Sequence, residues 1–119
     1  MEDEVTKELV LDKPVKVSWS QNIVDYTKLV FTRYADGKTL AVILRENPET
    51  GCDYIDISIA IPEANLGPGE FCLNHNLMPE VKKEIEDNLD LYENTGRTVP
   101  SGFLDFPIMK LKEKYMKYI

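Results

Sequence analysis

The sequence has little of the material from which most catalytic and metal sites are built. In 119 residues it contains one histidine, His75, and two cysteines, Cys52 and Cys72. A structural zinc site needs four ligands, and a cysteine or serine nucleophile needs a nearby base. The sequence has too few such residues to predict either site. We therefore expect no metal, no cofactor and no catalytic residue, in a protein that is not an enzyme. Cys72 is expected to be a small core residue.

Long apolar runs are also missing. No run approaches the roughly 18 apolar residues that a membrane-spanning helix requires. The start of the chain, Met1-Glu2-Asp3-Glu4, is acidic, whereas secretory signals begin with basic residues. We expect a cytoplasmic protein that does not enter a membrane and keeps both cysteines reduced.

Positive charge is scarce as well. Fourteen lysines and arginines against 21 acids give a formal net charge of −7. This charge repels phosphate backbones, so we expect no direct binding to nucleic acid. The acids concentrate in residues 1–8 and 80–93, while residues 110–117 are rich in lysine. The acidic runs are either solvated faces or surfaces that meet a basic partner.

The remaining composition is that of a folded protein. Hydrophobic residues make up 43% of the chain and charged residues 29%, far from the composition of disordered segments. A chain of this length falls within the range of one domain. We expect a single domain over residues 1–119, with loose ends at 1–7 and 113–119.

Strand patterns dominate the first half. Residues 5–17 fit two edge strands, or one strand broken at Pro14, because proline cannot donate to a ladder. Residues 22–26 are expected to form a turn or a single helical turn. The strongest signal is a hairpin of residues 28–34 and 39–45 around Asp36-Gly37. In that hairpin Phe31 lies opposite Val42 and Leu29 opposite Leu44.

The segment 53–61 predicts a further strand with one buried face, because isoleucine occupies every second position from Ile55 to Ile61. As an open edge it would be prone to aggregation, so we expect it to lie between neighbours or across a dimer. Residues 71–73 suggest a short strand and residues 103–111 a last one, which Pro107 places at an edge. Residues 93–102, rich in Gly, Asn and Pro, are expected to form a loop.

One amphipathic helix is expected at about residues 79–91. Pro79 suits the first helical position, and Val81, Ile85 and Leu89 recur at four-residue spacing. The fold class is therefore α+β, with a mostly antiparallel sheet of about four to six strands and one main helix.

Candidate binding residues lie in three places. In the 94–102 loop, Arg97 and Ser101 together with backbone N–H groups could hold an anion, although ordinary turn chemistry explains the same residues. The turn before the helix offers Asn74 and His75. The acids of the helix could face a basic partner, with Glu84 and Asp87 as our candidates there; the full set is Glu80, Glu84, Glu86, Asp87 and Asp90.

Three segments resemble a known family. They are Phe71-Cys72-Leu73-Asn74-His75-Asn76, the helix from Pro79 to Leu91, and Thr95-Gly96-Arg97 followed by Ser101-Gly102-Phe103 and Pro107. Together, over about Phe71 to Leu111, they resemble a family of short proteins of bacterial conjugative elements and phages that is classed as a domain of unknown function. The resemblance implies an accessory protein of a mobile genetic element.

These observations leave two main hypotheses of function. In the first, the protein binds another, unidentified protein, for example as an inhibitor of a host defence factor, with its acids mimicking phosphates. In the second, it binds a small ligand or nucleotide at the 94–102 loop. A structural or regulatory subunit of a conjugation apparatus is a third reading. The protein is expected to be a monomer or a homodimer.

Overall fold

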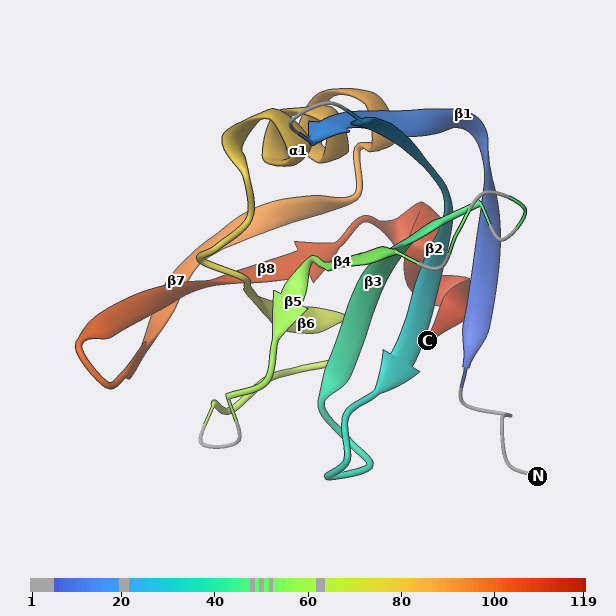
Figure 1. The fold of residues 1–119 in the computed structure, drawn as a ribbon. Coiled ribbons are helices and arrows are strands. Elements are labelled where there is room, and N and C mark those ends of the chain that lie inside the picture. The colour runs from blue at the N-terminus through green and yellow to red at the C-terminus, as the bar shows by residue number, and fades with distance from the viewer. Residues whose placement is uncertain (1–5, 20–21, 48, 50, 52, 62–63) are drawn as a thin grey trace.

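A computed structural model describes residues 6–19, 22–47, 49, 51, 53–61 and 64–119. Within these ranges the chain forms strands along most of its length, with one helix in the second half and a helical turn at the C-terminus (Figure 1). The elements in order are β1 Lys7–Trp19, β2 Asn22–Arg33, β3 Leu40–Glu46, β4 Tyr54–Asp56, β5 Ser58–Ile59, β6 Glu70–Leu73, α1 Pro79–Glu84, η2 Ile85–Leu89, β7 Tyr92–Ser101, β8 Leu104–Leu111 and η3 Glu113–Tyr118.

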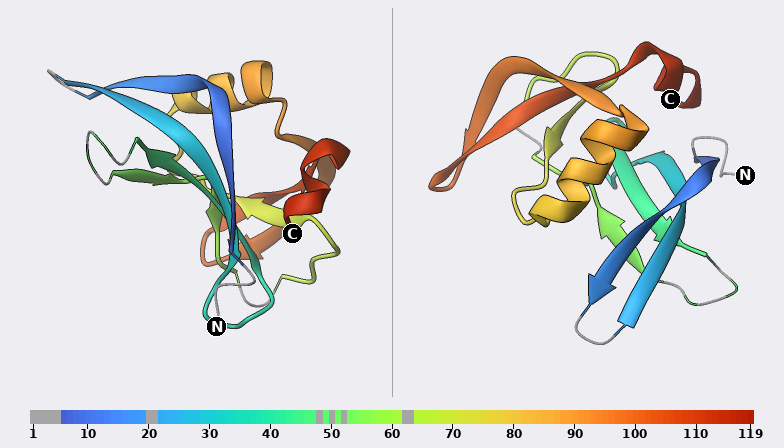
Figure 2. Two further views of the ribbon diagram at one scale, coloured as in Figure 1. Left: turned by 90° about the vertical axis from the view of Figure 1, so that its right-hand side faces the viewer. Right: turned by 90° about the horizontal axis from the view of Figure 1, so that it is seen from above.

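The strands build two antiparallel sheets. Sheet A has the order β1-β2-β3-β4 and sheet B the order β5-β6-β8-β7. The predicted α+β class is thus confirmed, but the strands are divided between two sheets of four. Both helical segments and sheet B lie on one side of sheet A (Figure 2).

The division into two sheets arises within the segment 53–61. Its first half, β4, pairs with β3 in sheet A, and its second half, β5, pairs with β6 in sheet B. At the crossing, the N–H of Ile57 donates to the carbonyl of Val42 at 3.0 Å, and the carbonyl of Ile57 accepts from the N–H of Asn74 at 2.9 Å. The prediction of one strand with one buried face was therefore wrong. Ile55 and Ile57 pack into the core between the sheets, whereas Ile59 and Ile61 pack on the other face of sheet B.

Two apolar clusters follow from this arrangement. The main core lies between the sheets and is closed by the helix and by Tyr115. A smaller cluster covers the outer face of sheet B and contains Cys72, which is fully buried as expected. The buried members of this second cluster are Ile61, Cys72, Phe106 and Ile108.

The hairpin of β2 and β3 has the predicted register, with Phe31 opposite Val42 and Leu29 opposite Leu44. Its turn is closed by Asp36, whose Oδ1 accepts from the N–H of Lys38 at 2.9 Å and from the N–H of Thr39 at 2.8 Å. The expectation of a turn at residues 22–26 was wrong, because these residues form the first part of β2. Their partner is β1, a single strand whose ladder is interrupted between Val10 and Val15, around Pro14.

Residues 93–101, which were expected to form a loop with Gly102, belong to the strand β7, and of the predicted loop Gly102 alone lies in a turn. The ladder is irregular between Asn94 and Thr98, and Gly96, with φ +84°, lies in this irregularity. The turn-forming residues of this segment therefore form a β-bulge inside the strand. Pro107 is not at an edge either, because β8 lies between β6 and β7. The pairing of β6 with β8 ends at Ile108, so at Pro107 no bond to β6 is lost.

The predicted helix is confirmed over residues 79–89, as the α-helical α1 continued by the π-helical η2. Val81 and Ile85 are buried, and Leu89 packs against the same core. The helix ends at Asp90, which adopts a left-handed conformation with φ +50°. The C-terminal segment η3 also packs on the core, where the ring of Tyr118 stacks on Phe31 at 5.4 Å.

Candidate functional site

The structure does not bring Arg97 and Ser101 together as an anion site. Arg97 lies in the bulge of β7, and its guanidinium forms an ion pair with Glu70 of β6. The N–H of Gly67 also donates to Glu70, and both partners hold the pKa of this carboxyl below its usual range. Ser101 lies at the far end of β7, opposite Leu104 in the ladder.

Asn74 and His75 occupy the turn after β6, and Asn74 has a structural role. Its side-chain nitrogen donates to the carbonyl of Asp56 at 2.9 Å, and its side-chain oxygen accepts from the N–H of Asn76 at 3.0 Å. His75 is exposed, and its ring meets the ring of Phe106 edge-on at 5.2 Å. This pair extends the second cluster toward solvent.

The acids of the helix are partly neutralised by the lysines of the same helix. Lys82 pairs with Glu86 at 2.9 Å, and Lys83 pairs with Asp87 at 2.7 Å, both at i,i+4 spacing. The side-chain nitrogen of Asn88 donates to Glu84 at 2.8 Å. The helix therefore presents alternating charges and side-chain amides instead of a continuous acidic row.

Glu86 also accepts a hydrogen bond from the Tyr92 hydroxyl at 2.7 Å. Partial burial raises the pKa of Glu86, but the bonds from Tyr92 and Lys82 outweigh burial, so the net pKa lies below its usual range. Burial and the adjacent carboxylate raise the pKa of Tyr92 far above its usual value. This hydrogen bond connects the helix to the start of β7, so we assign the pair a structural role.

A groove of about 450 Å³ lies between the irregular part of β1, the helix and η3. At its base the hydroxyl of Tyr115 donates to the carbonyl of Leu89 at 2.5 Å, and burial raises the pKa of this tyrosine. The rim carries charges of both signs, so it does not select a ligand of one charge. The lining includes Leu9, Leu11, Asp12, Lys13, Glu84 and Lys114.

The most exposed apolar side chains of sheet B lie at the end of the β7–β8 hairpin. Phe103 has a relative exposure of 107% and Leu104 of 47%. Figure 1 shows this hairpin extending away from the rest of the molecule. The turn has Gly102 at its first central position with φ +64°, as in a type II′ turn, and Phe103 follows it. We refer to residues 101–104 as the hairpin tip.

Within the hairpin tip, Ser101 was predicted as a binding residue for a small ligand and Gly102 and Phe103 contributed only to the family resemblance, so an apolar anchor at Phe103 was not predicted. The alternation of Leu104, Phe106 and Ile108 predicts a strand with one buried face, and in the structure the burial fades toward Leu104. The available signal was Gly102-Phe103 itself, because glycine at the first central position of a two-residue turn leaves Phe103 at the second, outside both strands.

Comparison of the chain with protein-family models, curated proteins and solved structures finds no match. The resemblance of residues 71–111 therefore remains a prediction. Within the described part of the chain, no group of three or more His, Cys, Asp or Glu side chains is placed to hold a metal ion. The helices in the same ranges are too short or too polar to cross a membrane.

Proposed function

We propose that the protein acts by binding another protein, and that the hairpin tip is the part that it inserts into its partner. The observation that carries this proposal is the complete exposure of Phe103 at the end of a projecting hairpin. A large apolar side chain in water is unfavourable by about 1.5–3 kcal/mol relative to a buried one. Its burial in a partner would recover this free energy.

The backbone that presents Phe103 is well ordered by pairing. Val99 lies opposite Phe106, Pro100 opposite Asp105, and Ser101 opposite Leu104, so the ladder runs to the turn itself. A backbone held in this way loses little conformational freedom on binding. Aromatic residues with such placement are typical anchors of protein interfaces.

The biological setting of the proposal rests on the resemblance of residues 71–111 alone. It suggests an accessory protein of a mobile genetic element or phage, whose partner is a host factor such as a defence nuclease. The partner's site should contain an apolar pocket deep enough for an aromatic ring. Asp105, exposed beside the tip, favours a basic residue at the edge of that pocket.

Two other surfaces are less favoured as the partner site. The acids of the helix have lysine or amide neighbours, which weakens a phosphate mimic. The alternative of ligand binding at residues 94–102 loses its main cation, because Arg97 already pairs with Glu70.

The proposal is tested by capture of host proteins on the purified chain and on Phe103→Ser. Because Phe103 is fully exposed, the substitution should leave the melting temperature unchanged. The matched control is Ile23→Ser in β2, which removes another exposed apolar side chain, 69% exposed, far from the tip. We expect a protein that the wild type and Ile23→Ser retain and that Phe103→Ser releases.

Retention of the same proteins by Phe103→Ser would contradict the proposal. The capture should be run at low and high salt. A partner anchored by an aromatic ring should survive high salt, whereas one that binds through the acids of the helix should be released.

A further inference from the structure

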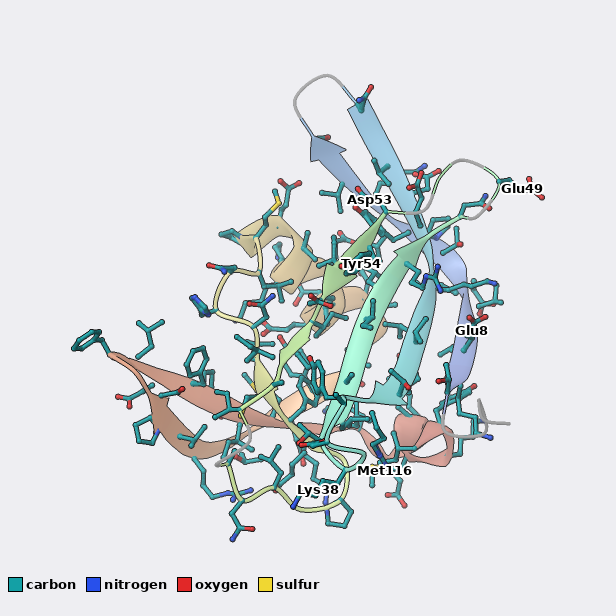
Figure 3. All side chains as sticks on the ribbon, turned by 60° about the horizontal axis from the view of Figure 1, so that its bottom comes forward. Glu8, Lys38, Glu49, Asp53, Tyr54 and Met116 are labelled. Atoms are coloured by element: carbon teal, nitrogen blue, oxygen red, sulfur yellow. The ribbon has the colours of Figure 1, made fainter. Side chains whose placement is uncertain are left out.

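The outer face of sheet A is covered by no other element of the described chain. The register of the ladders places its outward side chains in rows across the four strands. Figure 3 shows Tyr54 and Glu8 on the strands at the two edges of this sheet. The first row is Val10, Lys28, Arg45 and Tyr54, and the second row is Glu8, Val30, Ile43 and Asp56.

This face exposes large apolar side chains among its charged ones. Val10 has 66% and Tyr54 59% of its surface exposed, and Ile43 in the second row is half-buried. With Ile23 further along β2, the face carries three of the five large hydrophobic side chains that the described residues expose; the other two form the hairpin tip. An open sheet face that exposes three such side chains among its charged ones is a candidate interaction surface.

The face is also neutral, in a chain whose net charge is −7. Three of its ionisable residues are basic and three are acidic, so their charges cancel. Lys16 pairs with Asp25 at 3.0 Å, and Lys28 with Glu8 at 3.3 Å. Two copies of the chain, which repel each other elsewhere, can therefore approach through this face. The six residues are Glu8, Lys16, Asp25, Lys28, Arg45 and Asp56.

We propose that two copies of the chain pack against each other through this face, about a two-fold axis that crosses the strands between the two rows. Such an axis lays the first row of one copy over the second row of the other. Tyr54 then lies opposite Asp56 of the second copy and can donate its hydroxyl proton to it. Packing of two sheets face to face is a common arrangement.

The same axis makes the charges complementary. Asp56 of one copy comes next to Arg45 of the other, because Arg45 and Tyr54 are neighbours in the first row. Glu8 likewise comes next to Lys28, and the half-buried side chain of Ile43 is covered by the stem of Arg45. This interface is separate from the hairpin tip, which belongs to sheet B.

Sedimentation equilibrium in the micromolar range tests the proposal on the full chain. We expect a dimer for the wild type and for Phe103→Ser, which removes an exposed apolar residue elsewhere. Val10→Asp and Arg45→Glu should each raise the dimer dissociation constant by about tenfold or more. The double variant Arg45→Glu/Asp56→Arg should restore dimerisation, since it exchanges the two charges within each contact.

Val10, Arg45 and Asp56 are exposed, so variants at these positions should fold, which circular dichroism verifies. A wild-type chain that stays monomeric throughout this range would overturn the proposal. Dimers that persist unchanged in both Val10→Asp and Arg45→Glu would overturn it as well. Either result leaves the Phe103 capture experiment unaffected, so failure of the dimer and failure of the hairpin proposal can be distinguished.

Discussion

Ser58 is the polar residue that the described core buries, and it lies where the chain passes from sheet A to sheet B. Its Oγ accepts from the N–H of Val42 at 2.9 Å and lies 2.8 Å from the Tyr34 hydroxyl. The backbone pairing of β4 with β3 ends at Asp56. Beyond this point the side chain of Ser58 accepts the hydrogen bond of Val42 in β3.

We predict that Ser58→Ala lowers the free energy of unfolding by about 1–3 kcal/mol, because it leaves the buried N–H of Val42 without an acceptor. Tyr34→Phe is the control, since it removes one hydrogen bond but keeps the acceptor of Val42. Its loss should be smaller, about 1 kcal/mol. Urea denaturation measures both, and equal losses would show that the N–H of Val42 is not what Ser58 protects.

Asp36 predicts a specific dependence of stability on pH. Hydrogen bonds from the Thr39 hydroxyl and from the N–H groups of Thr39 and Lys38 lower its pKa to about 2. In the unfolded chain an aspartate has a pKa of about 3.9. The stabilisation is therefore present above pH ~4 and is lost as the pH falls toward ~2.

We expect the urea midpoint of the wild type to fall over this acidic range more steeply than that of Asp36→Asn, which has no carboxyl to protonate there. The remaining fall in the variant comes from other carboxyls with lowered pKa, such as Glu70 and Glu86. Parallel curves for the two proteins would contradict the role assigned to Asp36.

At the scale of elements, the β7–β8 hairpin depends on its turn. Gly102 has φ +64°, and a Cβ at this position would meet no atom within 4 Å. Gly102→Ala therefore tests backbone strain without a steric clash, at an expected cost of about 1–2 kcal/mol. Gly67→Ala is the matched control, because Gly67 has no positive φ and its added Cβ would make only ordinary contacts.

We predict that Gly102→Ala, but not Gly67→Ala, lowers the urea midpoint and weakens capture of the partner, because the turn no longer directs Phe103 in the same way. Unchanged capture with Gly102→Ala would show that presentation by the turn is unimportant for binding.

The elements that could be predicted from the sequence are those with local signals. The β2–β3 hairpin has its turn residues at Asp36-Gly37 and alternating apolar residues on both sides, so even its register was accessible. The helix has Pro79 at its start and a clear apolar face. Strand β7 could not be predicted, because its glycine and asparagine are typical of loops. In the structure they form a bulge, which exists only because β7 pairs with β8.

At the scale of the whole molecule, the division into two sheets could not be predicted either, because it depends on which strands pair. The alternation from Ile55 to Ile61 continues through the crossing, while the partner strand changes from β3 to β6. Periodicity indicates which side chains share a face only while the strand stays in one sheet, so it did not show that Ile55 and Ile57 face the main core while Ile59 and Ile61 face the other side of sheet B. Phe103 was not predicted as a binding residue, because the predicted sites depend on charged and polar side chains and its signal is apolar.

The whole molecule then offers three distinct surfaces: the hairpin tip, the helix with its lysine-paired acids, and the outer face of sheet A. We expect the partner to bind at the hairpin tip. Amide hydrogen exchange of the chain, measured with and without the captured partner, shows which residues the partner covers. We predict that the partner slows exchange in residues 98–106 and leaves residues 80–90 unchanged. Protection of residues 80–90 with no change at the hairpin would contradict the account and assign the partner to the helix.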